Sequence, residues 1–319
     1  MKDRLGRTIE YARISVTQNC NLKCIYCIPG TEESSLPACT PISAVEFGII
    51  AASLVELGIR KIRVTGGEPL MRRDIIEIIE HISRVPGIED LSLTTNGIRL
   101  KQCAHSLKEA GLIRVNISLD SLQEENFKRM TGGGRLEDVL VGIKEALSVG
   151  LVPVKINTVL VRGVNDGEVD DFIQLAKDRN VVVRFIELMP IGRYGEENVD
   201  KMIPSQELIQ ERPYLIEDQE MHDHQPARYY RVEGTEGRIG FISPMSHRFC
   251  DRCNRIRITC DGKVKPCLGN NGEVDILDTL RMAPEQLTAL LRDIIFSKPE
   301  GHGFGLSFSS QRNMNRIGG

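Results

Sequence analysis

Short stretches in which hydrophobic and polar positions alternate recur along the first 190 residues, and longer amphipathic stretches separate them. The alternating stretches predict strands at residues 12–17, 61–65, 90–95, 113–119, 153–161 and 181–188. The amphipathic stretches predict helices, which include residues 42–58, 71–85, 137–150 and 167–180. Strand–helix units in succession predict a parallel sheet with crossover helices, which leaves a doubly wound sheet or a partial barrel.

One face is polar on five of the six predicted strands. Arg13 and Ser15 alternate with Ile14, for example, and Arg63 alternates with Val64. A strand covered by helices on both faces is normally hydrophobic throughout. A closed eight-stranded barrel fills its lumen with branched apolar side chains. A sheet edge would explain one or two polar faces but not five, so we predict an α/β fold, an incomplete (β/α)6 TIM-like barrel with a polar cavity.

Beyond residue 190 the alternation ends. Residues 190–240 are polar and carry no assignable motif, residues 241–270 hold a group of cysteines, and a helix is predicted at residues 284–298. We therefore predict two parts. Residues 1–190 form the partial barrel, and residues 191–319 form a C-terminal region that binds a second cluster and caps the barrel.

Composition narrows the class of protein. The odd number of cysteines, 9, and their clustering argue against a secreted disulfide framework. The chain begins without an apolar signal and has no apolar run long enough to span a bilayer, so we expect a cytoplasmic protein without a membrane partner. The net charge of −3 gives no support for nucleic-acid binding, so any attraction to an anion must be local.

Three cysteines in the stretch "CNLKCIYC" follow the first predicted strand. Cys20, Cys24 and Cys27 have the spacing C-x3-C-x2-C, and no fourth cysteine lies nearby. Thiolates bind soft metals and iron–sulfur clusters, whereas structural zinc sites prefer four ligands in paired C-x2-C spacings. In a parallel barrel, the end of a strand is where active sites are built. The spacing therefore indicates a cluster with three protein ligands and one open iron.

This arrangement, followed by "TGGEPL" at the end of the second strand, resembles the radical S-adenosylmethionine (SAM) superfamily. The resemblance implies that the open iron of a [4Fe-4S] cluster binds SAM. It also implies SAM contacts at matching positions, namely Tyr26, Gly66, Gly67, Glu68, Ser118 and Met189. Each of these has a simpler interpretation as well, since glycines serve strand–helix turns, and Ser or Met often ends a strand.

A second cysteine group occurs in "FCDRCNRIRITCDGKVKPCLG". All four of its cysteines could bind zinc or a closed cluster. Alternatively, Cys250, Cys253 and Cys267 bind a cluster and Cys260 only packs. Spacing alone does not decide between these alternatives.

Two cysteine groups flanking six strand–helix units, "NRIR" directly after C-x2-C, and a Gly-Gly end together resemble the GTP 3′,8-cyclase family. The resemblance implies a lyase that converts GTP to (8S)-3′,8-cyclo-7,8-dihydroguanosine 5′-triphosphate, the first step of molybdenum cofactor biosynthesis. It implies two [4Fe-4S] clusters, with the three-ligand version at the second group. The expected partners are GTP, an electron donor such as flavodoxin or ferredoxin and the next enzyme of the pathway, with a homodimer as a candidate assembly.

Basic residues on several predicted strands are then candidate contacts for the triphosphate of GTP, because guanidinium groups bind phosphate in a bidentate manner. The resemblance implies GTP contacts at Arg13, Arg63, Thr94, Lys155, Arg184, Arg255, Ile256 and Arg257. It also implies catalytic roles for Arg13, Gly318 and Gly319, although a glycine-rich terminus is otherwise most often disordered. Two rival hypotheses are a two-cluster radical SAM enzyme acting on a peptide or other small molecule, and a non-catalytic cluster carrier.

Overall fold

The computed structural model describes residues 1–28, 41–218, 226–305 and 308–318. The six predicted strands are all present as β1 Tyr11–Ser15, β2 Lys61–Thr65, β3 Asp90–Thr95, β4 Arg114–Ser118, β5 Val154–Leu160 and β6 Val181–Glu187. Each pairs in parallel with the next along the chain. The helices that connect them are α1 Ala44–Glu56, α2 Ile75–Ser83, α3 Leu100–Glu109, α4 Glu124–Thr131, α5 Leu136–Ser148 and α6 Val169–Asp178. The predicted strand–helix alternation is confirmed.

The C-terminal region contributes further strands to the same sheet. Its strands are β7 Leu215–Glu217, β8 Ala227–Val232, β9 Arg238–Ile242, β10 Arg255–Ile258, β11 Lys263–Lys265 and β12 Val274–Asp275. Its helices are α7 Gly192–Glu197, α8 Ser205–Gln210, α9 Leu277–Met282, α10 Leu287–Phe296 and α11 Met314–Ile317. The strand order within the described residues is β12-β11-β10-β1-β2-β3-β4-β5-β6-β9-β8-β7. Because β9 is parallel to β6 and β10 is parallel to β1, the region extends the sheet of the barrel at both ends.

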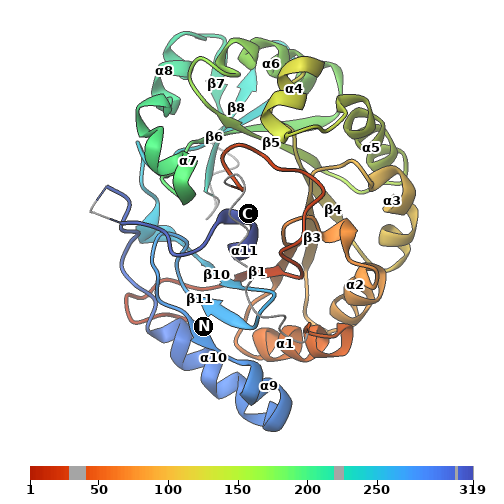
Figure 1. The fold of residues 1–319 in the computed structure, drawn as a ribbon, viewed down its shortest axis with the longest axis vertical. Helices are drawn as coiled ribbons and strands as arrows, with labels where there is room; N and C mark the ends of the chain where they lie inside the picture. Colours follow the sequence, from red (N-terminus) through yellow and green to blue (C-terminus); the bar gives the residue numbers. More distant parts are fainter. Residues whose placement is uncertain (29–40, 219–225, 306–307, 319) are drawn as a thin grey trace.

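The sheet curls around a central space, with helices α1 to α6 on its outer side (Figure 1). Its outward-facing side chains, such as Ile14, Ile62 and Val64, are fully buried beneath these helices. The alternate positions face inward, and the register places Arg13 beside Arg63 on one neighbouring strand and beside Arg257 on the other. The polar lumen expected from the alternating pattern is therefore present, and the incomplete barrel is confirmed.

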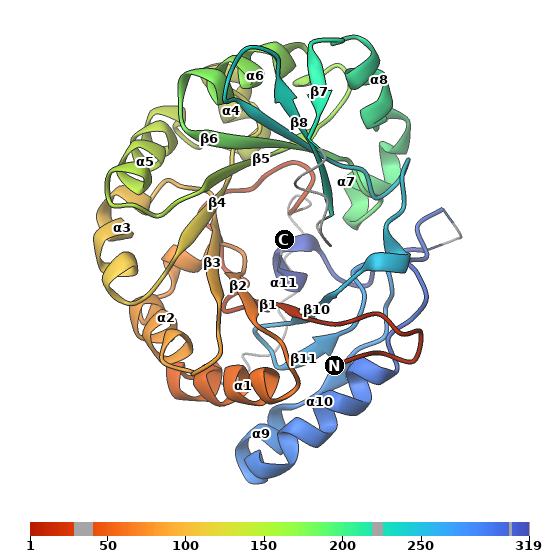
Figure 2. The same cartoon turned by 180° about the vertical axis from the view of Figure 1, so that it is seen from behind.

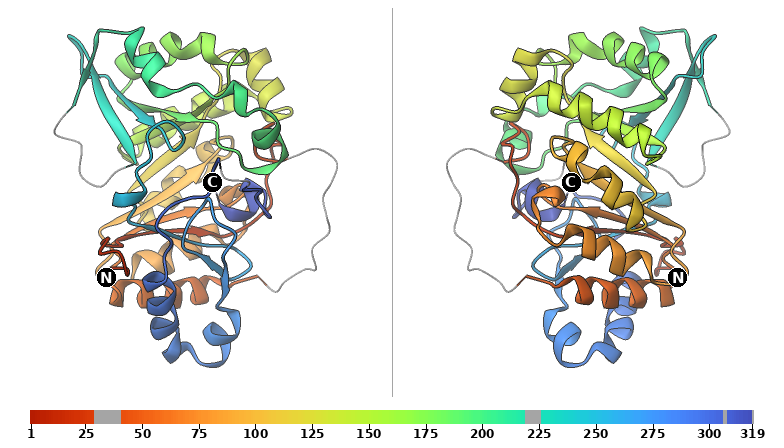
Figure 3. Two further views of the ribbon diagram at one scale, coloured as in Figure 1. Left: turned by 90° about the vertical axis from the view of Figure 1, so that its left-hand side faces the viewer. Right: turned by 90° about the vertical axis from the view of Figure 1, so that its right-hand side faces the viewer.

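The C-terminal segment returns to the middle of the barrel. Helix α11 lies at the centre of the molecule in both face views (Figures 1 and 2), and Ile317 is buried there. In the side views, α9 and α10 project beneath the barrel (Figure 3). Among the described residues, no helix combines the length and apolar character needed to cross a membrane.

Candidate active site

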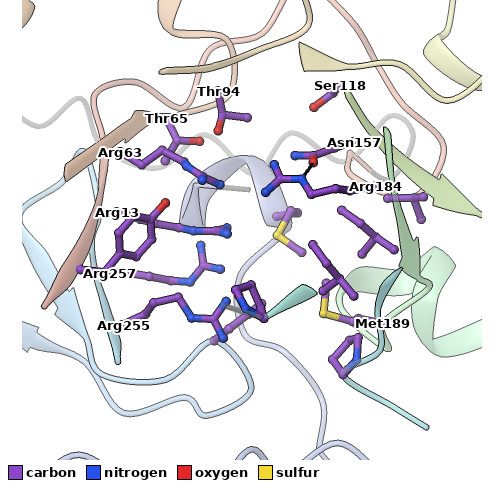
Figure 4. A pocket seen from close by; sticks show the side chains of 18 of the residues that line it. Arg13, Arg63, Thr65, Thr94, Ser118, Asn157, Arg184, Met189, Arg255 and Arg257 are labelled. Atoms are coloured by element: carbon purple, nitrogen blue, oxygen red, sulfur yellow. Dashed lines mark hydrogen bonds between the residues drawn. The ribbon is translucent and has the colours of Figure 1, made fainter. Parts of the chain in front are cut away.

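A cavity of about 510 Å³ occupies the middle of the barrel, a size typical of small-molecule sites. Its lining includes all six predicted cysteine ligands, which are Cys20, Cys24, Cys27, Cys250, Cys253 and Cys267. Inward side chains of the strands, which include Arg13, Arg63 and Arg184, point into this cavity (Figure 4). The two halves of the chain thus contribute to one chamber.

The first cysteine group lies on a loop after β1 that is held by backbone hydrogen bonds to the end of α4. The amide of Lys23 donates to Thr131 O at 2.9 Å, and that of Ile25 donates to Met130 O at 3.0 Å. Burial raises the pKa values of the Cys20 and Cys24 thiols, and it raises that of Cys27 to about 12. Neutral thiols are thus favoured, and binding them as thiolates requires a positively charged metal centre.

The glycine turn "TGGEP" supports this loop by close packing. A Cβ on Gly67 would lie 2.5 Å from the carbonyl oxygen of Asn19, and one on Gly66 would lie 2.6 Å from that of Thr17. The amide of Gly67 also donates to Thr17 O at 2.7 Å. Both glycines line the cavity, so they combine the expected approach to a ligand with a packing role that the sequence did not predict.

The side chain of Glu68 does not line the cavity, so a contact of this residue with SAM would come from its main chain. Its buried carboxylate accepts hydrogen bonds from the amide of Asn96 at 2.7 Å, the hydroxyl of Thr95 at 2.8 Å and the amide of Leu70 at 3.0 Å. Asn96 in turn donates to Asn21 in the cysteine loop at 2.8 Å. These bonds occupy the carboxylate, so Glu68 supports the cysteine loop rather than facing a ligand.

Tyr26, Thr94, Ser118 and Met189 all line the cavity, as expected. The hydroxyl groups of Tyr26 and Thr94 differ in their hydrogen bonding. The hydroxyl of Tyr26 donates to Asp120 at 2.7 Å, which fixes the cysteine loop to the end of β4. The hydroxyl of Thr94 is buried and has no hydrogen-bond partner among the described residues, so it is available to a ligand.

The cations Arg255 and Lys298 lie beside the second cysteine group. Burial would raise the pKa of Cys253, but Arg255 and Lys298 beside it lower that pKa to about 6. Burial raises the pKa of Cys267 even though Lys298 opposes the rise. Cys260, which lies in the turn between β10 and β11, is not part of the cavity lining. This placement favours the three-ligand alternative.

Each cysteine group offers three thiols, and the chemistry of these donors fits an iron–sulfur cluster. In a cubane cluster each thiolate binds a different iron atom. All eight cysteines in the described part of the chain are free of disulfides, so the six that line the cavity are available as ligands.

Cations from several strands converge in the cavity that both cysteine groups line (Figure 4). The expected members that line the cavity are Arg13, Arg63, Lys155, Arg184, Arg255 and Arg257. The Nε atoms of Arg13 and Arg63 are buried and have no hydrogen-bond partner among the described residues. Burial, together with repulsion from Arg184, Arg114 and Arg63, lowers the pKa of Lys155 to about 6, so its amine is largely neutral at pH 7 unless an anion binds beside it. Buried guanidinium groups that repel one another are surroundings that an anionic ligand would stabilise.

Ile256 does not belong to this group. Its side chain is fully buried in the hydrophobic core and does not line the cavity, because it alternates with Arg255 and Arg257 along β10. Only its backbone remains available for a contact.

The guanidinium of Arg184 is held in place by hydrogen bonds that it donates to the side-chain oxygen of Asn157 at 2.9 Å and to that of Asn116 at 2.7 Å.

The C-terminal tail reaches the cavity. Arg257 donates a short hydrogen bond to the carbonyl of Gly318. Gly318 has φ +84°, and an added Cβ would lie 2.8 Å from Thr65 Cγ2 and 3.0 Å from Ser15 Cβ. Gly319, the other expected catalytic glycine, lies outside the described residues.

Several residues at the site were not predicted. Asp120 anchors Tyr26, Lys298 lies beside Cys253 and Cys267, and the ring of Phe249 lies 4.8 Å from the guanidinium of Arg255. The guanidinium carbon of Arg63 lies 5.4 Å from the centre of the Tyr11 ring. Single charged or aromatic residues of this kind carry no spacing signal, so only Tyr11 could have been found, from its place on the inward face of β1.

Comparisons with known proteins agree with this arrangement. The model of the radical SAM superfamily matches residues 14–176, and the Molybdenum Cofactor Synthesis C model matches residues 181–304. The GTP 3′,8-cyclase of Alkaliphilus oremlandii is 47% identical over the full length of both chains. That of Listeria monocytogenes is 43% identical and covers 100% of this chain and 99% of its own.

A solved structure shares the fold at low sequence identity. Streptococcus suis SuiB bound to S-adenosylmethionine matches with a TM-score of 0.61 and 15% identity, covering 89% of this chain and 68% of its own.

Proposed function

The chain belongs to the GTP 3′,8-cyclase family of radical SAM enzymes, and we propose that it cyclises GTP to (8S)-3′,8-cyclo-7,8-dihydroguanosine 5′-triphosphate. This is the first step of molybdenum cofactor biosynthesis. The observation that carries the proposal is the set of buried cations between the two cysteine groups. In the described residues, the buried Nε atoms of Arg13 and Arg63 have no hydrogen-bond partner. A triphosphate supplies both the missing negative charge and the missing acceptors.

The residues divide into two binding sets. Cys20, Cys24 and Cys27 hold the first [4Fe-4S] cluster, and Tyr26, Gly66, Gly67, Ser118 and Met189 bind SAM beside it. Cys250, Cys253 and Cys267 hold the second [4Fe-4S] cluster, and Arg13, Arg63, Thr94, Lys155, Arg184, Arg255 and Arg257 bind GTP. When bound, the clusters and SAM supply the one-electron chemistry that joins the ribose of GTP to its base.

The protein itself orients and shields the substrate. Inward residues on adjacent strands present fixed donors to the triphosphate, so little reorganisation is needed on binding. Arg257 links this set to the carbonyl of Gly318, which places the tail against the ends of β1 and β2. With the tail in this position, part of the lumen is closed to water.

Four further features belong to the proposal. Residues 1–190 act as the SAM-binding part and residues 191–319 as the part that binds the second cluster. The enzyme works in the cytoplasm, where a reducing environment preserves its free thiols. An electron donor such as flavodoxin or ferredoxin reduces it, and the next enzyme of the pathway receives its product. A homodimer is the proposed assembly.

The test is a product assay under anaerobic conditions. Protein with reconstituted clusters is incubated with SAM, dithionite and GTP, and mass spectrometry follows 5′-deoxyadenosine and a product with the mass of GTP. We expect both to form together with GTP and neither to form with ATP. Deoxyadenosine that forms regardless of the nucleotide would retain the radical SAM assignment and reject GTP as substrate, leaving a peptide or another small molecule. Bound iron without any deoxyadenosine would indicate a cluster carrier.

A further inference from the structure

Lys298 is a buried cation with no role in binding GTP or SAM as proposed above. Its side chain is 1% exposed, it follows α10, and it lines the cavity. The ammonium donates to the carbonyl of Arg255 at 2.8 Å and to that of Pro266 at 2.5 Å. Arg255 comes two residues after Cys253, and Pro266 comes directly before Cys267. A single ammonium therefore joins the two segments that carry these cysteines.

Arg7 holds the third cysteine segment from the opposite end of the chain. Its guanidinium donates to the carbonyl of Cys250 at 2.9 Å, to that of Pro299 at 2.7 Å and to that of Glu300 at 2.9 Å. Arg7 thus fixes Cys250 to the residues that immediately follow Lys298.

The side chain of Asp3 is fully buried, and it accepts from Arg7 Nε at 2.7 Å and from the Arg7 amide at 2.9 Å. A buried ion pair of this kind contributes little to net stability but fixes geometry, because breaking it leaves an uncompensated charge. The pair therefore fixes the direction in which the guanidinium of Arg7 points.

Together, Arg7 and Lys298 contact all three cysteine segments, and we call these two residues the cationic bracket. They differ in electrostatics. The charge of Arg7 is compensated by Asp3, whereas the described residues provide no carboxylate that pairs with Lys298. The charge of Lys298 acts instead on Cys253 and Cys267. Hydrogen bonds and net charge around the sulfur ligands are what a protein uses to tune the reduction potential of a cluster.

We propose that the cationic bracket positions the three cysteine segments for the second cluster, and that the ammonium of Lys298 raises the reduction potential of that cluster. The inference rests on the proposed function, since it takes Cys250, Cys253 and Cys267 as ligands. Both bracket residues are positioning residues, because they contact the cysteine-bearing backbone and not the substrate.

The test uses the full chain with Cys20, Cys24 and Cys27 changed to Ala, so that all bound cluster reports on the second group. Iron and sulfide content, the rate of iron loss to a chelator, and the midpoint potential from an EPR-monitored redox titration are measured. Lys298→Met removes charge and donor, Lys298→Gln removes only the charge, and Lys298→Arg keeps both. Lys263→Met is the matched control, because Lys263 makes its ion pair with the half-exposed Asp275.

We expect Lys298→Met to lose iron faster and to have a lower midpoint potential. Lys298→Gln should hold iron but also show the lower potential, and Lys298→Arg and Lys263→Met should match the parent. Arg7→Gln should also lose iron faster, but it leaves the Asp3 carboxylate without its cation, so the electrostatic part of the inference is tested at Lys298 alone. If Lys298→Met does not fold, Lys298→Gln still tests the potential.

An unchanged potential in Lys298→Gln would overturn the electrostatic part of the inference. Unchanged iron retention in both Lys298→Met and Arg7→Gln would overturn the positioning part. Absence of iron from the parent background would instead reject the cluster assignment itself, so failure of the inference and failure of the proposed function are distinguishable.

Discussion

The two cysteine groups face one cavity but have opposite surroundings. The first is held by backbone hydrogen bonds and close glycine packing, and buried carboxylates lie near it, with Asp120 acting on Cys24 and Cys27 and Glu68 acting on Cys20. The second is held by the side chains of buried cations, and Arg255 and Lys298 act on Cys253. Similar ligand sets thus have buried carboxylates near the first group and buried cations near the second.

This difference matches the ligands assigned to each group. SAM carries a sulfonium cation, whereas GTP is a polyanion. A negative field beside the first group favours the cation, and a positive field beside the second favours the anion. Under the proposed function, this contrast would direct SAM to the first group and GTP to the second within one cavity.

The largest expected effect comes from the tail, which lies between the two fields. Removing Gly318 and Gly319 should lower product formation by about 100-fold or more, because the link from Arg257 to the strand ends is lost. Both clusters should remain, as measured by iron content, and the product is followed by mass spectrometry.

Gly318→Ala sharpens this prediction with a matched control. Gly318 and Gly234 both have positive φ values, +84° and +72°, but only at Gly318 would a Cβ meet other atoms. Gly318→Ala should therefore impair product formation, and Gly234→Ala should not. Full activity in the truncated protein would mean that Gly318 and Gly319 have no role in product formation.

Arg13→Ala should weaken the positive field where it faces the triphosphate. Loss of a charge-assisted hydrogen bond is expected to weaken GTP binding by about 1.5–3 kcal/mol, or about 10- to 150-fold, and SAM binding should not change. Calorimetry under anaerobic conditions measures both. Arg162→Ala is the control, since Arg162 forms an exposed pair with Glu207. Equal loss of SAM and GTP affinity would contradict the separation of the two sites.

Gly67→Ala should disturb the first group alone. The added Cβ would approach Asn19 O to 2.5 Å, so the cysteine loop must shift, at an expected cost of about 1–3 kcal/mol. Iron at the first group should become labile to chelators, while the second group keeps its iron. Gly167→Ala, where a Cβ meets no atom within 4 Å, is the control. Labile iron at both groups would show that the contacts that hold the first cysteine group and those that hold the second are not independent.

The last prediction concerns the carboxylate beside the first group, where the expected effect is on stability and not on ligand binding or iron retention. Burial raises the pKa of Asp120 to about 6, above its value in the unfolded chain. The folded state therefore binds more protons between about pH 4 and pH 6, and stability falls as pH rises through that window before levelling off. Asp120→Asn should remove this slope and increase stability above pH 6 by about 1–3 kcal/mol.

Denaturant unfolding at a series of pH values measures the effect, with the exposed Asp200→Asn as control. An unchanged slope in Asp120→Asn would mean that the carboxylate is not the group that titrates.

Much of the barrel was predictable because alternation has a physical cause. Arg13 and Arg63 had to face inward once Ile14 and Val64 packed beneath helices, and the register then placed them together. The lengthening of the sheet by β9 and β10 was not predictable. Their pairing with β6 and β1 joins residues far apart in the chain, and no local pattern signals such contacts.

The site was predictable where spacing carried the signal. All six cysteines line the cavity, whereas Ile256 and Glu68 do not. The side chain of Ile256 points away from the lumen, because it alternates with those of Arg255 and Arg257. The carboxylate of Glu68 accepts hydrogen bonds from Thr95 and Asn96 instead. Lys298 was missed because its role comes from two carbonyl groups supplied by distant segments.

The most direct test of the central claim, that the two groups serve different ligands, is equilibrium binding of SAM and of GTP to Cys24→Ala and Cys267→Ala under anaerobic conditions. The account predicts that Cys24→Ala loses SAM and keeps GTP, whereas Cys267→Ala keeps SAM and binds GTP more weakly. Loss of the same ligand in both variants would contradict it.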